Sequence, residues 1–262
     1  MYIRSSCLRV LVAGLLAITS FAAHGDGDAA TQEPASESGW TVVAAPYLWA
    51  AALEGTLGQP RLPPLDVDAS FGDIVEHLDM ALMGVVEVRK DRLGLFSDVQ
   101  YVRLSTSAET PAGIAATGTE VTATTATLLA AGTWRALEGS GHSLDLMAGL
   151  RGWHTTTEIA FTGGLLNGRS SSQTESWVDP MAGLRGRYDL TGHLFAMGWA
   201  MYGGFGLASQ SSWDLMAGLG YEIGDRMSLV AGYRSLAVDY STDGFIYDVV
   251  QSGPLLGLSY RF

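Results

Sequence analysis

The last eleven residues of the chain, Ser252-Gly-Pro-Leu-Leu-Gly-Leu-Ser-Tyr-Arg-Phe262, constrain the fold most strongly. In a β-strand, residues of opposite parity lie on opposite faces. One parity is apolar and ends in two aromatic residues: Pro254, Leu256, Leu258, Tyr260 and Phe262. The other parity is mostly small or polar: Gly253, Leu255, Gly257, Ser259 and Arg261. This pattern favours a strand with lipid on one side and an aqueous lumen on the other, although the last strand of a soluble sandwich can also alternate.

The amino-terminal segment predicts export. Arg4 and Arg9 precede an apolar run over residues 10–23, and Ala23-His-Gly25 is a small-residue cleavage site, so residues 1–25 form a predicted signal peptide. The run is shorter than the roughly 20 residues that a membrane anchor helix needs. The only cysteine, Cys7, precedes the run, so it cannot be a lipid-acceptor residue and would leave with the signal. Residues 26–39 are polar and acidic and predict a flexible periplasmic leader.

Composition excludes several classes of protein. A second run of 18 apolar residues is missing from the sequence, which excludes a helical membrane protein. Beyond residue 39 no segment with a helical period is longer than two turns, as an α/β enzyme would require. The net charge of -12 disfavours nucleic-acid binding.

Ten segments with strand-like alternation recur between residues 40 and 262. They cover residues 40–53, 78–90, 93–105, 119–136, 143–159, 175–190, 193–207, 213–223, 227–240 and 247–262. Each is long enough to cross a bilayer at a tilt of about 45°, which needs about 9–11 residues. We therefore predict ten strands, or eight if one segment folds back as a loop.

The connections between these segments alternate in length. The short ones, 90–92, 138–142, 191–193 and 224–226, carry turn residues. The others, 54–77, 106–118, 160–174, 208–212 and 241–246, are longer or more polar. Outer-membrane barrels have tight periplasmic turns and larger external loops. The predicted fold is thus an all-β transmembrane antiparallel up-and-down β-barrel over residues 40–262, with both termini in the periplasm.

Three motifs carry a resemblance to known proteins: Pro46-Tyr-Leu-Trp49, Gly232-Tyr-Arg234 and Ser252-Gly-Pro-Leu-Leu-Gly257. With them, residues 40–262 resemble the small outer-membrane β-barrel proteins of Gram-negative bacteria, in the broad OmpA/OmpW-like superfamily. The resemblance implies the architecture and a location in the cell outer membrane. The three motifs occur together in one branch of that superfamily. Because no catalytic residues are agreed for this branch, the resemblance assigns none to this chain.

Strand parity predicts which charged residues face the lumen, since an ionised side chain near the middle of a bilayer is costly. We expect Glu87, Arg89, Asp98, Arg151, Asp179, Arg185, Arg187 and Asp214 to face inward, with Arg234 as a further candidate. In so narrow a barrel these groups can pair across the lumen and fill it, whereas in an open small pore they would form a selectivity ring. An aromatic girdle at the strand ends is predicted from Trp40, Trp134, Trp199, Trp213, Tyr188 and Tyr221.

The longest predicted loop, 54–77, contains a helical signal. Ser70 and Asp73 have the spacing of a capping box, and Phe71, Ile74 and Leu78 share one helical face. We expect one or two helical turns there. They either pack within the loop or lean over the barrel mouth as a gate.

An enzymatic barrel of the lipase, acyltransferase or protease type is the alternative, with its site at the external rim. The best candidate is His154, which Thr155, Thr156, Thr157 and Glu158 follow. Period two places His154, Thr156 and Glu158 on one face without deciding which face. A polar strand end would look the same.

The sequence therefore favours a structural or passive small-solute transport role over catalysis. A transport role implies that small or apolar solutes enter through the wall or the mouth. The sequence offers no metal-ligand pattern and no phosphate-binding loop, so we expect neither a metal nor a cofactor. Expected partners are outer-membrane lipids, lipopolysaccharide and the barrel-assembly machinery, which would read the terminal strand that ends at Phe262.

Overall fold

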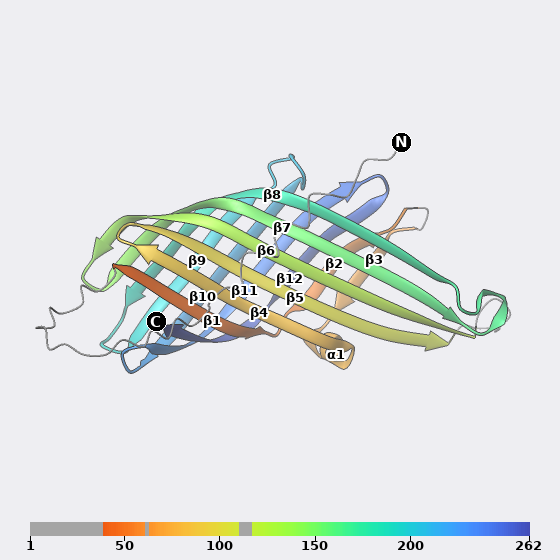
Figure 1. Ribbon diagram of the computed structural model, residues 1–262, viewed down its shortest axis with the longest axis horizontal. Helices are drawn as coiled ribbons and strands as arrows, with labels where there is room; N and C mark the ends of the chain where they lie inside the picture. The colour runs from red at the N-terminus through yellow and green to blue at the C-terminus, as the bar shows by residue number, and fades with distance from the viewer. Residues whose placement is uncertain (1–38, 61–62, 110–116) are drawn as a thin grey trace, which may run out of the picture. The chain divides into compact units, whose positions relative to one another are not determined.

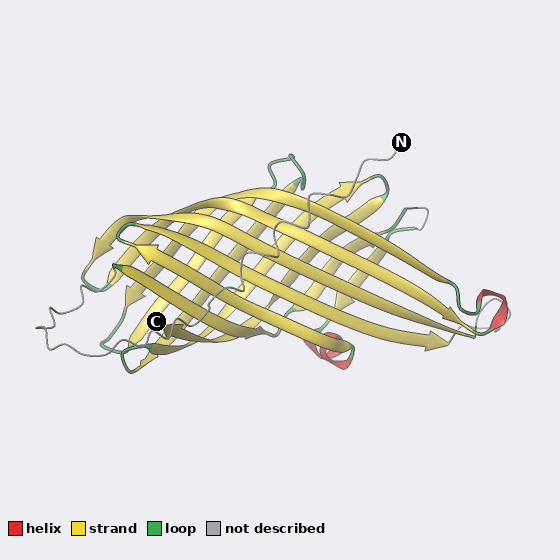
Figure 2. Ribbon diagram, in the orientation of Figure 1, coloured by secondary structure: helices red, strands yellow, loops and turns green. Residues whose placement is uncertain are grey.

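The computed structural model describes residues 39–60, 63–109 and 117–262. The predicted signal peptide lies outside these ranges, as does the predicted leader apart from residue 39, so both stay predictions. The described residues form a barrel of antiparallel strands (Figure 1, Figure 2). None of the helices in this part of the chain is long and apolar enough to cross a membrane.

The first barrel strand is made of two segments. β1 (Trp40–Trp49) and β2 (Ala52–Gly58) both pair with β12 (Phe245–Arg261). The strand is interrupted only at residues 50 and 51, where the backbone N–H of Ala50 still donates to the carbonyl of Pro254 at 2.9 Å. This strand is five residues longer than predicted.

The second barrel strand is also divided. β3 (Leu65–Ala69) pairs with β2, and β4 (Leu78–Lys90) pairs with β1 and with the next strand. Helix α1 (Phe71–Glu76) lies between them along the chain. The prediction of a long loop over residues 54–77 was therefore wrong in part, because β2 extends into this range and forms a hairpin with β3. The prolines at 60, 63 and 64 break the alternation there and hide it from a sequence reading.

The predicted helical turns are confirmed in α1. The backbone N–H of Asp73 donates to the Ser70 hydroxyl at 3.3 Å, and the backbone N–H of Ser70 donates to the Asp73 carboxylate at 2.9 Å. The Ser70 hydroxyl also donates to the same carboxylate at 2.6 Å. These hydrogen bonds from Ser70, first from its side chain and then from its backbone, lower the pKa of the Asp73 carboxyl.

The remaining strands each cross the barrel once. They are β5 (Leu93–Glu109), β6 (Gly118–Gly139), β7 (His142–Thr162), β8 (Ser170–Asp189), β9 (Leu194–Gly203), β10 (Ser211–Ile223) and β11 (Met227–Thr242). Each pairs with its neighbours in sequence, and β1 pairs with β12 to close the ring. The predicted ten-strand up-and-down barrel is confirmed, and the eight-strand alternative is excluded.

The two ends of the barrel differ. At one end, here called the turn end, the connections are residues 91–92, 140–141, 190–193 and 224–226. Asp91 and Gly141 adopt positive φ angles of 51° and 84°, which tight turns between antiparallel strands require. The opposite end, here called the loop end, carries α1 and the short 3-10 helix η1 (Gly164–Leu166).

The β5–β8 wall extends furthest at the loop end (Figure 1). β6, β7 and β8 have 22, 21 and 20 residues, whereas β9 has 10. Because a tilted strand crosses a bilayer in about 9–11 residues, each long strand is about twice as long as a crossing requires.

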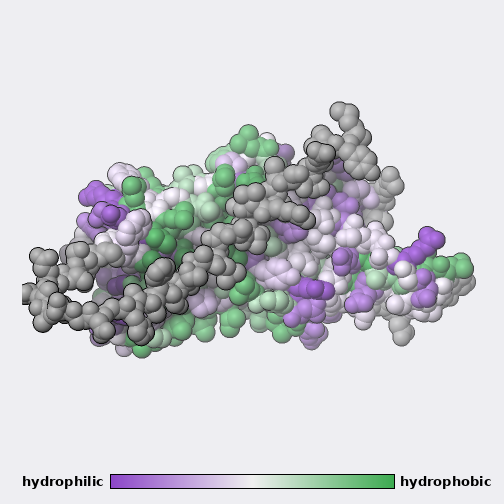
Figure 3. All heavy atoms as spheres, viewed as in Figure 1, coloured by the Kyte–Doolittle hydropathy of each residue, from purple (hydrophilic) through white to green (hydrophobic). Residues whose placement is uncertain are grey.

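The alternation predicted for β12 is confirmed. Leu256 is 50% exposed and Phe262 72% exposed on the outer face, whereas Leu255 on the inner face is buried. Other strands also turn large apolar residues outward, among them Leu48, Leu82, Leu95, Leu150, Val178, Leu184, Leu215 and Leu219. Hydrophobic residues gather mainly over the middle of the barrel in Figure 3, with hydrophilic ones mostly toward its ends. This belt is the surface that lipid would cover.

The aromatic girdle is confirmed in most positions. Trp40, Trp134, Tyr188 and Tyr221 are exposed on the outer face. The prediction for Trp199 was wrong, because this residue is only 7% exposed and points into the lumen. Its indole N–H donates to Asp214 at 2.9 Å, so the ring follows a buried charge rather than the membrane interface.

Two glycines on paired strands provide a test of this geometry. A Cβ added to Gly149 in β7 would lie 2.1 Å from the carbonyl oxygen of Ala130 in β6, so the strands would have to separate. Gly149→Ala should lower the free energy of unfolding by about 1–3 kcal/mol, measured by urea titration of the barrel in lipid. A Cβ on Gly132 in β6 would lie 3.8 Å from the nearest atom, so Gly132→Ala is the matched control and should change little. Equal effects of both substitutions would contradict this pairing register of β6 with β7.

Candidate functional site

Arg234 in β11 lies in the middle of the lumen and is fully buried. Its Nη2 lies 2.5 Å from Asp98 Oδ2 in β5 and 2.6 Å from Asp214 Oδ2 in β10. Its Nε donates to Asp214 Oδ1 at 3.0 Å, and its Nη1 donates to the hydroxyl of Tyr47 in β1 at 2.8 Å. The guanidinium group of Arg234 therefore connects β10, the neighbour of β11, to β1 and β5, which lie elsewhere around the barrel.

The partners of Arg234 are themselves held in place. Arg151 in β7 forms a second ion pair with Asp214. The Tyr47 hydroxyl donates to Asp98 Oδ1 at 2.7 Å, and Gln100 Nε2 donates to Asp98 Oδ2 at 3.0 Å. Two buried guanidinium groups thus meet two buried carboxylates, which leaves this cluster without net charge. Such balance is required because an unpaired charge buried in a protein is strongly destabilising.

The structure brings Asp98, Arg151 and Asp214 from the predicted lumen set into this cluster. Parity reasoning identified Arg234 only as a further candidate and did not identify Tyr47. We call the group Tyr47, Asp98, Arg151, Asp214 and Arg234 the septum.

Aromatic rings surround the septum. The Arg234 guanidinium carbon lies 5.3 Å from the ring centre of Trp49 and 5.2 Å from that of Trp199, which adds cation–π attraction. On β7 and β8, Trp153 and Trp177 stack with ring centres 5.6 Å apart. Trp177 also stacks on Tyr240 at 4.1 Å.

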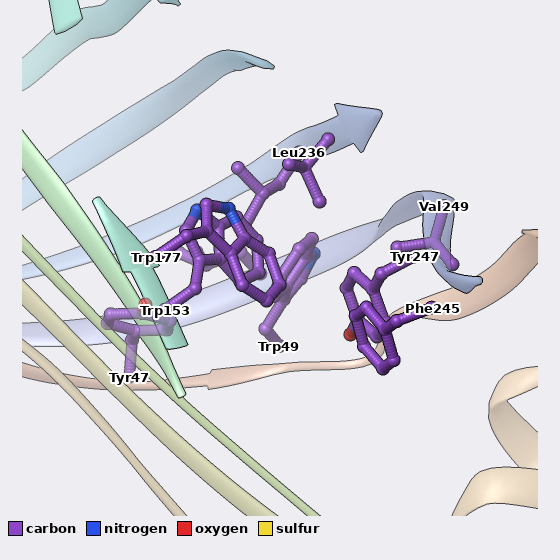
Figure 4. Packing of buried hydrophobic residues seen from close by; sticks show 10 residues of the cluster. Tyr47, Trp49, Trp153, Trp177, Leu236, Phe245, Tyr247 and Val249 are labelled. Carbon is purple, nitrogen blue, oxygen red and sulfur yellow. The ribbon is translucent and has the colours of Figure 1, made fainter. Parts of the chain in front are cut away.

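Figure 4 shows Trp49, Trp153 and Trp177, which form a buried aromatic cluster together with Phe245 and Tyr247 of β12. Sequence reasoning missed it, although Trp153 shares its parity with Arg151 and Trp177 with Asp179. That shared parity was the available signal.

A second group of charges lies closer to the turn end. Arg89 Nη2 lies 2.6 Å from Asp145 Oδ2 and 2.8 Å from Glu87 Oε1. Arg185 pairs with Glu87 from across the lumen, and Arg135 Nε lies 2.9 Å from Asp145 Oδ1. Arg89, Glu87 and Arg185 belong to the predicted set, whereas Asp145 and Arg135 extend it.

Arg187, also in the predicted set, lies at the turn-end rim. It pairs with Glu222 at 2.6 Å and with Asp189 at 2.9 Å, and its side chain is 34% exposed. Its guanidinium carbon lies 3.6 Å from the ring centre of Phe195. Arg187 is therefore a rim residue rather than part of the septum.

Asp179 departs from the expected pairing with an arginine. Its carboxylate is fully buried and accepts hydrogen bonds from the backbone N–H of Ser209 at 2.9 Å and from the Ser209 hydroxyl at 2.7 Å. Arg151 is its register partner on β7 but turns to Asp214 instead. Asp179 thus fixes the β9–β10 connection against the inside of the barrel. The sequence does not reveal this role, because it does not show that Ser209 in this short loop lies next to Asp179.

Two hollow regions of the lumen lie on either side of the septum. The turn-side vestibule has a volume of about 480 Å³ and is lined by Tyr47 and Phe96, among others. The loop-side chamber has a volume of about 630 Å³ and is lined by Trp49 and Gln100, among others. Their described lining residues do not overlap, and Asp98, between Phe96 and Gln100 on β5, lines neither.

The candidate catalytic residue His154 lies on the outer face of β7. Its neighbours Trp153 and Thr155 face inward and are buried, and its Nδ1 lies 2.8 Å from the Ser176 hydroxyl on β8. Thr156, on the same outer face, hydrogen-bonds to Thr174 at 3.0 Å. Within the described residues, no cluster of three or more His, Cys, Asp or Glu residues has a geometry that could hold a metal ion.

Comparison with solved structures agrees with this architecture. The outer membrane protease OmpT from Escherichia coli is 11% identical, with a TM-score of 0.57, over 85% of this chain and 97% of that chain. The translocator domain of the autotransporter NalP from Neisseria meningitidis is 18% identical, with a TM-score of 0.45, over 86% of this chain and 89% of that chain.

The fold is that of an outer-membrane β-barrel. At such low identity the likeness to OmpT extends to the fold alone. No protein-family model and no curated protein sequence matches the chain.

The septum predicts a large difference between two aspartates. Asp214→Ala removes the shared partner of Arg151 and Arg234 and should lower the free energy of unfolding by about 3–5 kcal/mol. The matched control is Asp239→Ala on β11, because Asp239 is only partly buried and lies opposite Asp248. That change should cost less than about 0.5 kcal/mol or stabilise slightly, since like charges directly opposite repel. Urea titrations in lipid measure both, and a loss below about 1 kcal/mol for Asp214→Ala would contradict the septum's role.

Proposed function

We propose that this protein is an outer-membrane barrel with a structural or passive small-solute role, in which the septum closes the lumen to ions and hydrophilic solutes. The observation that supports it most directly is the burial of Asp98, Arg151, Asp214 and Arg234, each at most 1% exposed. In an open pore lined with charges, the charged groups face water and passing ions. Here they face one another, so the lumen is filled at this level as expected for a narrow barrel.

We infer that the loop end faces outward and that both termini lie in the periplasm. Short turns on the periplasmic side and larger loops outside are usual in such barrels. Trp40, at the start of β1, pairs with Lys90 beside the turn at 91–92, and Arg261 of β12 pairs with Val43. Both ends of the barrel chain therefore lie at the turn end.

The proposed partners follow from the outer surface. The exposed apolar belt would contact outer-membrane lipids and, on the outer side, lipopolysaccharide. β12, with Phe262 exposed at its end, would be the strand that the barrel-assembly machinery reads.

An outer-membrane enzyme is the alternative, and the specific observation in its favour is the fold shared with the protease OmpT. The candidate identified from sequence supports it poorly. His154 is hydrogen-bonded to Ser176 on the outer wall rather than at a cavity, and the loop-side chamber is lined without it. Detecting hydrolysis of phospholipid, lipid A or peptide by the purified protein would favour the enzyme.

Two arginine variants test the proposal. Arg151→Ala removes one septum member but leaves Asp214 paired with Arg234 and bonded to Trp199, so the barrel should still fold. Arg185→Ala is the matched control, because Arg185 lines the turn-side vestibule outside the septum. In planar bilayers and liposome-swelling assays, wild type and Arg185→Ala should be closed and Arg151→Ala should leak.

A wild-type barrel that already passes sugars would contradict the proposal. If Arg151→Ala then changed only the ion preference, the septum would be a selectivity ring and the protein a small porin.

A further inference from the structure

The loop-side chamber and the turn-side vestibule have opposite chemistry. The vestibule is lined by charged side chains of both signs, including Glu87, Arg89, Asp145 and Arg185. Among the described residues that line the chamber, none is charged. This is notable in a chain with 27 acidic and 15 basic residues.

Toward the loop end, apolar residues of the long strands line the chamber. Val102 and Leu104 of β5, Val121 and Ala123 of β6 and Ile159 of β7 line the side made by the long strands. A charged ligand would lose its hydration here without gaining a partner of opposite charge, which is costly. The lining therefore selects against ions.

Uncharged polar residues, mostly threonines, also line the chamber, and some of them lie at its floor next to the septum. Gln100, Thr127 and Thr155 line the chamber and are 5%, 6% and 7% exposed. Gln100 uses its amide nitrogen on Asp98, so its carbonyl oxygen is the group that it can offer to a ligand. An apolar cavity with a few fixed polar groups is the usual form of a small-molecule site.

On one side the chamber is bounded by α1 rather than by a closed sheet. At the loop end β3 pairs only with β2, and β5 beyond Leu104 pairs only with β6. The sheet is therefore not closed between β3 and β5. Phe71 and Val75 of α1 line the chamber while remaining 44% and 46% exposed. In β4, which follows α1 in the chain, Met80 and Leu82 continue this exposed apolar surface onto the outer wall.

We propose that the loop-side chamber is a binding site for small, uncharged, mainly apolar molecules that carry at most one hydrogen-bonding group. This inference rests on the proposed function, since the septum forms the floor against which such a molecule stops. The apolar wall takes the body of the ligand, and Gln100, Thr127 and Thr155 take its polar group. Such a molecule would enter beside α1, where the sheet is not closed and the exposed apolar surface of Met80 and Leu82 adjoins the chamber wall.

The test uses two probes that share one ring system. N-phenyl-1-naphthylamine is uncharged, and 1-anilinonaphthalene-8-sulfonate carries one sulfonate. Each is titrated into liposomes that contain the wild-type barrel, and binding is read as saturable energy transfer from tryptophan, with Trp49 in the chamber wall as a nearby donor. We expect the uncharged probe to bind about tenfold or more tightly than the sulfonate.

Variants at one position assign the binding to the chamber. Ala123→Phe fills part of the site and Ala123→Asp adds a charge, so both should weaken binding of the uncharged probe, the second by about tenfold or more. Ala130→Phe is the matched control on the same strand, because Ala130 is exposed on the outer face. The heat-dependent shift of each variant on SDS gels checks that it is folded.

Equal binding of the two probes would overturn the proposal, as would binding of the uncharged probe that neither Ala123 variant changes. A membrane phospholipid held in the chamber that this probe cannot displace would overturn it too. These readouts use the closed wild-type barrel at equilibrium. They can therefore fail while the conductance assay still shows a closed septum, and the reverse also holds.

Discussion

A guanidinium group that is shielded from water needs hydrogen-bond acceptors for its N–H donors, and Arg234 donates four hydrogen bonds to residues on β1, β5 and β10. This requirement determines which residues lie together in the middle of the lumen. Asp98 and Asp214 must lie at one level of the lumen, and Arg151 must balance the second carboxylate. Because these residues are far apart in sequence, the septum fixes the barrel across its width, whereas backbone pairing fixes it only along its circumference.

The septum also gives the two halves of the lumen different environments. On the turn side, charged residues form chains of ion pairs such as Arg89 with Glu87 and Asp145. On the loop side, aromatic and aliphatic residues replace them, and the Trp153–Trp177–Tyr240 stack packs beside the chamber. Under the proposed function, the septum blocks ions, and the apolar compartment on its loop side retains an apolar molecule.

Sequence alone predicted the fold well, because a strand in a membrane must alternate. Parity identified the lipid-facing side of β12 and correctly turned Asp98, Arg151 and Asp214 inward. Parity cannot show which charges meet, since that depends on the stagger between strands that are not neighbours in sequence. Parity therefore predicted that Asp179 pairs with an arginine. In the structure, Ser209 of the β9–β10 connection donates hydrogen bonds to it instead.

Other features were not predicted from the sequence, for related reasons. Trp199 was assigned to the membrane interface by its residue type, although its partner Asp214 draws it inward. The β2–β3 hairpin was hidden by prolines in the connection between its strands. The chamber was not predictable, because a cavity arises from the combined shapes of residues on several strands and leaves no local pattern.

The central claim is that the septum separates the two halves of the lumen, and accessibility of single cysteines tests it most directly. Thr125→Cys reports on the loop-side chamber and Ser259→Cys on the turn-side vestibule. The only native cysteine, Cys7, lies in the predicted signal peptide. In liposomes with the loop end facing outward, a small uncharged thiol reagent that is too hydrophilic to cross the bilayer, added outside, should label the first position and not the second. Labelling of Ser259→Cys at a similar rate in the otherwise wild-type barrel would show a continuous pore and contradict the account.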